Sequence, residues 1–163
     1  MSRNRVLYVL PALACAALLG FGYYLQYFED QDPCPLCLVQ RGFYYLVLAT
    51  VAVAALHDPK RPGARTYSIL AFVFSIGGAA VAARQVWLQH LPADKVPDCG
   101  PDLYFMLNNL PLGRALEKLF MGSGQCAEVN WKFLGLSIAE WSLVWFAGLA
   151  LYALWLARRG RAA

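Results

Sequence analysis

The 163-residue chain is 60% hydrophobic and only 15% charged, which is too apolar for an ordinary soluble domain. Its net charge of +4 does not indicate nucleic-acid binding, because the basic residues gather at the ends of apolar runs and form no basic stripe. Spanning a bilayer takes about 20 mostly apolar residues per helix, and the segments 6–27, 37–56, 67–88 and 138–156 qualify. We therefore predict an all-α membrane protein, a four-transmembrane-helix bundle that forms a single integral membrane domain.

The first apolar segment follows Arg3 and Arg5, a pattern shared with cleaved signal peptides. The apolar run continues well past Cys15, however, and Leu13 stands where a lipoprotein cleavage site has a small residue. We expect an uncleaved helix in which Cys15 is a small buried apolar side chain.

The stretch DPCPLCLVQR at residues 32–41 joins the first connection to the second helix. Pro33 and Pro35 keep Cys34 out of a regular helix, and Cys37 falls in the first helical turn, where unpaired N–H groups favour a thiolate. Arg41 follows on the same helical face. Its fixed charge would stabilise a thiolate at Cys37 and donate hydrogen bonds to an electron-accepting carbonyl. The alternative is that Arg41 only extends to the membrane interface.

Two connections of different length separate the remaining helices. The segment 57–66 contains two prolines and a glycine, which predicts a tight turn between antiparallel helices. The segment 89–137 is a long loop, and within it residues 112–120 have helical spacing. We expect this short helix to lie in the membrane interface, with packing on the end of the bundle as the alternative.

The distribution of basic residues predicts the orientation. If the four helices alternate, one side of the membrane receives Arg3, Arg5, Lys60, Arg61, Arg65, Arg158, Arg159 and Arg161. Because Lys and Arg accumulate on the cytoplasmic side, both termini and the loop 57–66 are expected there. The loops 28–36 and 89–137 then face the opposite, oxidising compartment.

Four of the five cysteines fall on that oxidising side: Cys34, Cys37, Cys99 and Cys126. Four cysteines allow three pairings, of which the close spacing favours Cys34 with Cys37, leaving Cys99 with Cys126. The resting pairing stays open at this point.

Three kinds of cysteine site compete. A metal site is disfavoured because there is no second C-x-x-C, and the absence of a histidine after Cys37 excludes the haem-attachment motif. A structural disulfide suits Cys99 and Cys126 but not the C-x-x-C pair, whose loop is too small to constrain much of the unfolded chain. Redox catalysis is the interpretation that the C-x-x-C spacing favours.

A dithiol that generates disulfides must pass two electrons to an acceptor. A strongly oxidising partner such as DsbA has a reduction potential of about −120 mV, so few thiol couples could reoxidise it. A lipid-soluble quinone, ubiquinone or menaquinone, could reach the site from the bilayer. We expect the quinone to meet the dithiol at the outer end of the second helix, beside Cys37 and Arg41.

Two motifs resemble those of a known family. The first is Cys34-Pro35-Leu36-Cys37 followed by Gln40-Arg41, and the second is Ser123-Gly124-Gln125-Cys126-Ala127-Glu128 running into Trp131-Lys132-Phe133-Leu134-Gly135-Leu136. In this order, with Cys99 between them, they resemble the DsbB family of bacterial inner-membrane quinone reductases that reoxidise DsbA. The resemblance covers almost the whole chain.

The resemblance implies a role for each outer cysteine. Cys99 would be attacked by the DsbA thiolate to form a mixed disulfide, and Cys126 would be released to attack Cys34. Cys37 would then pass electrons to a quinone beside Arg41.

Other implications are less direct. His90 resembles a family histidine near the quinone and is equally well interpreted as an interfacial polar residue, while Arg84 suits a membrane anchor. Alternatives are a paralogue that serves a dedicated DsbA-like partner and a membrane scaffold with structural disulfides. A transmembrane reductant conduit would need paired cysteines within its helices, and the predicted spans contain no such pair.

Overall fold

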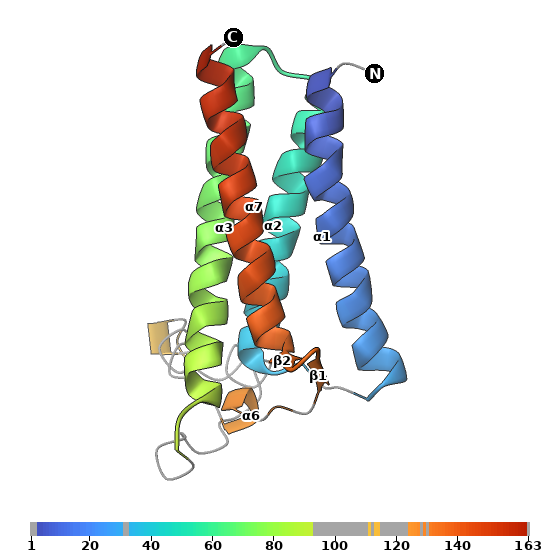
Figure 1. Cartoon of the computed structure of the whole chain (residues 1–163), viewed down its shortest axis with the longest axis vertical. Coiled ribbons are helices and arrows are strands. Elements are labelled where there is room, and N and C mark those ends of the chain that lie inside the picture. The colour runs from blue at the N-terminus through green and yellow to red at the C-terminus, as the bar shows by residue number, and fades with distance from the viewer. Residues whose placement is uncertain are drawn as a thin grey trace.

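Four long helices account for most of the described chain. The computed structural model describes residues 3–30, 33–92, 111, 113–114, 124–127, 129 and 131–162. The long helices are α1 (Arg3–Phe28), α2 (Pro35–His57), α3 (Arg61–Gln89) and α7 (Ile138–Ala162), and the short elements are α6 (Gly124–Ala127), β1 (Lys132–Phe133) and β2 (Leu136–Ser137). Both termini lie at one end of the bundle, while α6 and the strands lie at the other (Figure 1).

The long helices have the length and surface of membrane spans. Among the described residues, four segments are long and apolar enough to cross a bilayer: Arg5–Phe28, Pro35–His57, Pro62–Gln89 and Ile138–Arg159. Large apolar side chains such as Leu13, Leu56 and Leu151 point outward from the bundle, which suits lipid rather than water. The predicted class, an all-α membrane protein built as a four-helix bundle, is confirmed.

The turn between α2 and α3 is shorter than the sequence pattern suggested. Asp58 ends α2 in the left-handed conformation, with φ at 44° and its N–H bonded to the Ala54 carbonyl. The next helix already begins at Arg61, not at residue 67, and Pro62 stands in its first turn. Proline is tolerated there because the first N–H groups of a helix lack helical partners. The expected short helix at 112–120 lies outside the described residues apart from Gly113 and Arg114.

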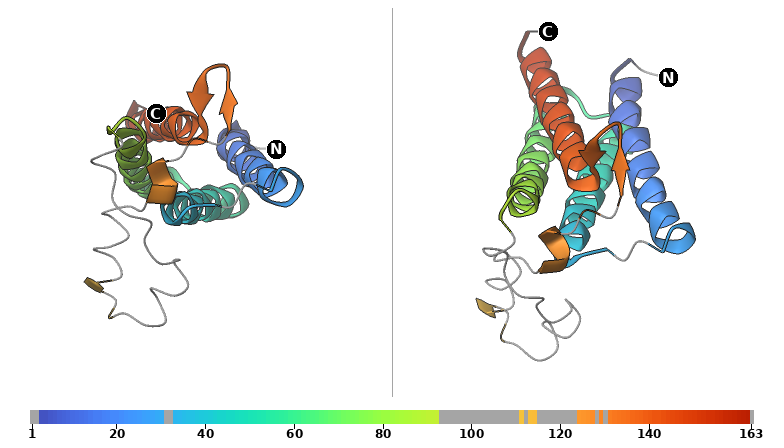
Figure 2. Two further views of the ribbon diagram at one scale, coloured as in Figure 1. Left: turned by 90° about the horizontal axis from the view of Figure 1, so that it is seen from below. Right: turned by 60° about the horizontal axis from the view of Figure 1, so that its bottom comes forward.

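Neighbouring helices meet in a fixed order. α2 packs against α1 and α3, and α3 packs against α7. The hairpin of β1 and β2 lies between the ends of α7 and α1 (Figure 2), while α6 rests against α3 and α2. The end of the bundle away from the termini is therefore closed by two short elements from the second half of the chain.

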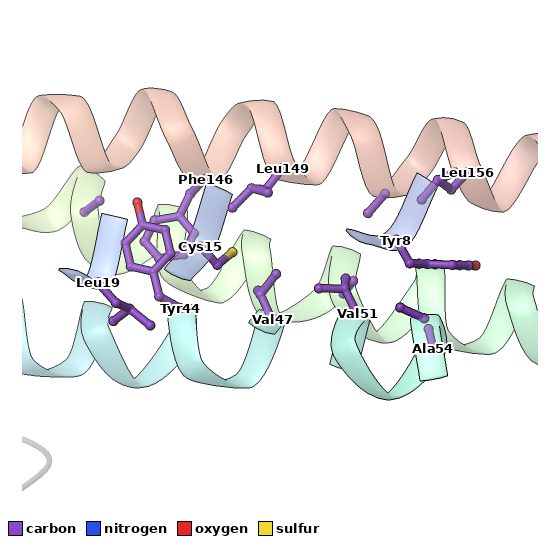
Figure 3. Close-up of a cluster of buried hydrophobic side chains, with 14 residues drawn as sticks. Tyr8, Cys15, Leu19, Tyr44, Val47, Val51, Ala54, Phe146, Leu149 and Leu156 are labelled. Atoms are coloured by element: carbon purple, nitrogen blue, oxygen red, sulfur yellow. The ribbon is translucent and has the colours of Figure 1, made fainter. Parts of the chain in front are cut away.

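An aromatic stack forms the centre of the core. The rings of Tyr44 and Phe146 are stacked with centroids 4.1 Å apart, and Cys15 is fully buried among the same cluster (Figure 3). A side chain at Gly78 would approach the Phe146 ring to 2.3 Å, so glycine allows α3 and α7 to pack closely here. The interpretation of Cys15 as a small buried apolar side chain is confirmed.

Candidate active site

Three sulfurs meet at the end of the bundle that carries α6. Cys34 is the N-cap of α2, in an extended conformation that the following Pro35 favours. Its Sγ lies 2.9 Å from Cys37 Sγ and accepts the Cys37 backbone N–H across 3.3 Å. The Cys34 thiol also hydrogen-bonds Cys126, which is fully buried in α6. Cys34 thus lies between Cys37 and Cys126, an arrangement suited to thiol–disulfide exchange.

The protonation of this cluster is uneven. Hydrogen bonding to Cys126 and then to Cys37, together with burial, raises the pKa of Cys34 above its ordinary value. Cys34 therefore favours the neutral thiol and donates its S–H to the Cys37 sulfur. Cys37 Sγ accepts that bond, and Cys34 Sγ in turn accepts the Cys37 backbone N–H.

Two buried glutamines complete the surroundings of the C-x-x-C pair. Gln85 on α3 places Nε2 at 3.4 Å from Cys34 Sγ and 3.2 Å from Cys37 Sγ. Gln40 on α2 donates from Nε2 to Gln85 Oε1 across 2.6 Å. The sequence pattern alone assigned no role to either glutamine. The available signal was a polar amide inside a membrane span, which is a functional indicator.

Arg41 lines the same site but is held by another helix. Its guanidinium donates from Nη1 to Gln26 Oε1 across 2.6 Å and from Nη2 to the Gly22 carbonyl across 2.9 Å. It also lies over the Tyr23 ring, 4.9 Å from the centroid. The geometry does not favour direct stabilisation of a Cys37 thiolate by Arg41, because the hydrogen bonds of the guanidinium run to α1. The donors at the Cys37 sulfur are Cys34 and Gln85.

A cavity of about 570 Å³ opens beside these side chains. Its polar lining includes Cys34, Cys37, Gln40, Arg41 and Gln85. Its aromatic lining is Phe21, Tyr44, Trp131, Phe133, Trp141 and Trp145. A mostly apolar cavity of this size with a few converging polar groups is typical of a site for a small organic molecule.

The β1–β2 hairpin contributes to one wall of the cavity. Leu134 and Gly135 have positive φ angles of 52° and 82°, the conformation of a tight type I′ turn. Trp141 on α7 donates from Nε1 to the Phe133 carbonyl across 3.0 Å. Ser137 and Glu140 form a reciprocal capping box at the start of α7. The hairpin is thereby attached to α7, and the aromatic residues around its turn reach the cavity.

The remaining predicted residues lie apart from this cavity or are not described. His90 caps the end of α3, with Nδ1 2.8 Å from the Val86 carbonyl, and it is absent from the cavity lining within the described chain. Its neighbour Gln89 lines the cavity instead. Arg84 lies over the Trp87 ring at 4.2 Å, in keeping with an anchor. Cys99 lies outside the described residues.

Fold and site together define a multi-pass membrane protein with a C-x-x-C pair and a third cysteine gathered at one end of its spans. The family model of the disulfide bond formation protein DsbB matches residues 4–156. The chain belongs to the DsbB family, as the sequence motifs predicted.

Relatives of this family are similar to the chain over nearly their whole lengths. The disulfide bond formation protein B of Hahella chejuensis is 50% identical over 159 residues, covering 97% of this chain and 96% of the relative. That of Nitrosococcus oceani is 47% identical, covering 93% and 89%. Disulfide bond formation protein B 1 of Pseudomonas aeruginosa is 43% identical, covering 90% of each. This chain is accordingly a membrane oxidoreductase of disulfide bond formation.

Proposed function

We propose that the chain reoxidises a periplasmic DsbA-type dithiol protein and passes the electrons to a membrane quinone. The observation that carries the proposal is the cavity of about 570 Å³, which brings Cys37 and Arg41 into one lining beside the membrane-spanning helices. A soluble acceptor would not need such a site. A lipid-soluble one would.

The lining fits a quinone headgroup in its chemistry. Aromatic walls suit a flat ring, and the volume lies within the range of small-molecule sites. Within the described residues, the hydrogen bonds of Arg41 to Gln26 and Gly22 leave further guanidinium N–H groups to donate to a carbonyl in the cavity. When bound, a quinone supplies an acceptor for two electrons and two protons.

The cysteines carry the electrons by successive thiol–disulfide exchanges. The partner thiolate attacks Cys99 in a Cys99–Cys126 disulfide, and the mixed disulfide is resolved as the partner forms its own disulfide. The released Cys126 thiolate then attacks Cys34 of a Cys34–Cys37 disulfide, with which it is in hydrogen-bond contact, and Cys37 leaves with the negative charge. Attack of the Cys99 thiolate on Cys126 in the resulting Cys34–Cys126 disulfide restores the Cys99–Cys126 bond and releases Cys34 as a thiol. Each exchange breaks one S–S bond and forms another, so the electron pair reaches Cys37 at the cavity wall.

We propose the bacterial inner membrane as the location, with both termini cytoplasmic. Support comes from the turn between α2 and α3 and the end of α7, which lie with the two termini at the end of the bundle opposite α6 (Figure 1). These segments carry Lys60, Arg65, Arg158 and Arg159. An impermeant thiol reagent added from the periplasm should label an introduced Gly113→Cys and not Lys60→Cys, both exposed positions. The reverse labelling pattern would contradict this orientation.

The function is tested with purified protein, reduced DsbA and a soluble quinone. We expect the quinone absorbance to fall in step with DsbA oxidation, and Cys37→Ser to abolish both. Turnover with a different DsbA-like protein alone would favour a paralogue with a dedicated partner. Full activity of the Cys34→Ser and Cys37→Ser variants would instead show that these cysteines have only structural roles, as in a membrane scaffold.

A further inference from the structure

Gln85 is the side chain of α3 that reaches both sulfurs of the C-x-x-C pair. Its Nε2 lies 3.4 Å from Cys34 Sγ and 3.2 Å from Cys37 Sγ, and the residue is only 4% exposed. An amide buried in a membrane-spanning helix is costly unless its hydrogen bonds are made. The burial of this amide therefore depends on its hydrogen bonds to the two sulfurs.

Gln40 determines which end of the Gln85 amide faces the cysteines. Gln40, also 4% exposed, donates from Nε2 to Gln85 Oε1 across 2.6 Å. That oxygen also lies 3.6 Å from Cys37 Sγ, but its shorter hydrogen bond is to Gln40, and the NH₂ group of Gln85 lies closer to the Cys37 sulfur. A negatively charged sulfur accepts such a bond more strongly than a neutral one, so the arrangement favours a thiolate over a disulfide.

We propose that Gln85 is a catalytic residue that stabilises the reduced Cys34–Cys37 couple by donating to the Cys37 thiolate, and that Gln40 is a positioning residue acting through it. The inference rests on the proposed role of the two cysteines as one redox couple. On reduction, two electrons break the S–S bond and one proton goes to Cys34. The charge stays on Cys37, where the Gln85 N–H group meets it.

The test measures this couple without quinone or DsbA. Full-length protein carrying Cys99→Ala and Cys126→Ala is equilibrated in detergent at pH 7 with glutathione mixtures, and its free thiols are counted by alkylation and mass spectrometry. Two glutathione thiols supply the electrons and become one glutathione disulfide, with one proton bound by Cys34 and one released to solvent. Only the C-x-x-C pair can respond, since the remaining Cys15 lies in the core.

Gln85→Met keeps the volume and removes the donor. It should lower the equilibrium constant for reduction about tenfold, which is about 30 mV in potential, and move the alkylation of Cys37 to higher pH. Gln40→Met should shift both in the same direction by less, because the amide of Gln85 is then free to turn. Ser75→Ala removes a buried hydroxyl elsewhere on α3, bonded to the Ala71 carbonyl at 2.8 Å, and should change neither.

A folded Gln85→Met protein with an unchanged glutathione equilibrium and unchanged pH dependence would overturn the inference. If Gln85→Met does not fold, Gln40→Met is measured in its place. An unchanged glutathione equilibrium in Gln40→Met would then overturn the inference. Failure of the parental Cys34–Cys37 pair to form a disulfide at any glutathione ratio would instead refute its proposed redox role. The two failures are thus separable.

Discussion

Single residues around the sulfur cluster differ in what their surroundings favour. Cys34 is enclosed between two other thiols, and its hydrogen bonds to Cys126 and Cys37 raise its pKa above 9.0. Cys37 faces the cavity and receives donors from Cys34 and Gln85. The two neighbouring sulfurs thus have different surroundings, because Cys34 is enclosed by other thiols and Cys37 receives the amide donor of Gln85.

The protonation of Cys34 gives a pH prediction. Since the raised pKa favours the thiol, alkylation of Cys34 in the reduced protein should rise only at higher pH than alkylation of an exposed cysteine introduced at Gly113. Cys126→Ala should move the Cys34 midpoint down, because the largest cause of the raised pKa is removed. Iodoacetamide rates across a pH series, resolved by mass spectrometry, measure both. A Cys34 midpoint at or below that of the exposed cysteine would contradict the prediction.

Arg41 gives a prediction about the acceptor. Arg41→Ala should raise the quinone KM about ten- to hundredfold, because charge-assisted hydrogen bonds contribute roughly 1.5–3 kcal/mol. Arg41→Lys should be intermediate, since lysine keeps the charge but cannot reach Gln26 and Gly22 with one planar group. Steady-state turnover at several quinone concentrations measures the effect.

The matched control for Arg41 is Arg84→Ala. Arg84 lies on α3 against Trp87, and it is not part of the cavity lining in the described chain. Its removal should leave the quinone KM unchanged. Arg41→Ala should not change the rate of single-turnover exchange with DsbA. A normal quinone KM in the Arg41→Ala variant would contradict the prediction and indicate that Arg41 is only a membrane anchor.

At the scale of elements, the hairpin and the start of α7 act as one unit. The capping box of Ser137 and Glu140 starts the helix, and Ser137 Oγ donates to Gln89 Oε1 across 2.8 Å, which ties the hairpin to α3. The rings of Trp131 and Phe21 meet edge to face, with centroids 5.7 Å apart, which adds a contact to α1. One cavity wall therefore depends on a four-residue ladder and its turn.

The turn gives a prediction about this wall. Gly135 has φ at 82°, so Gly135→Val forces a β-branched side chain into the left-handed region at a cost of roughly 1–3 kcal/mol. We expect a higher quinone KM and faster proteolysis at the hairpin. Gly148→Ala is the control, because it lies within α7 with open space around an added Cβ. Equal KM values for both variants would show that the hairpin does not shape the site.

At the scale of the whole molecule, the packing of α2, α3 and α7 brings the parts of the site together. The C-x-x-C pair stands at the start of α2, Gln85 belongs to α3, and Trp141 and Trp145 of the aromatic wall belong to α7. These helices meet through the stack of Tyr44 on Phe146, which requires the bare backbone of Gly78. Separation of α3 from α7 would therefore disturb the site from a distance.

Gly78→Ala tests this packing. Its Cβ would lie 2.3 Å from the Phe146 ring, so the helices must move apart at a cost of about 1–3 kcal/mol. Thermal unfolding in detergent should show a lower midpoint, with turnover reduced as a consequence. Gly42→Ala on α2, where an added Cβ meets nothing within 4 Å, should leave the midpoint unchanged or slightly raised. A normal midpoint for Gly78→Ala would exclude close packing at this position.

The sequence by itself determined the features that depend on neighbouring residues. Four apolar runs predicted four spans because a bilayer sets helix length. Pro33 and Pro35 placed Cys34 before the helix and Cys37 in its first turn, because proline restricts its own backbone and that of the preceding residue. The start of α3 was missed because proline is compatible with both a turn and a first helical turn.

Only the tertiary structure decided which side chains meet across helices. Gln85 lies 48 residues from Cys37, and Cys126 belongs to a different half of the chain from Cys34. The i, i+4 spacing placed Arg41 on the cavity side of α2, but the acceptors that hold its guanidinium are on α1. The rotation of each helix about its axis, and its depth relative to its neighbours, follow from packing such as that of Phe146 on Gly78. Local periodicity carries no information on those two quantities, so the partners of the reactive sulfurs could not be predicted from spacing.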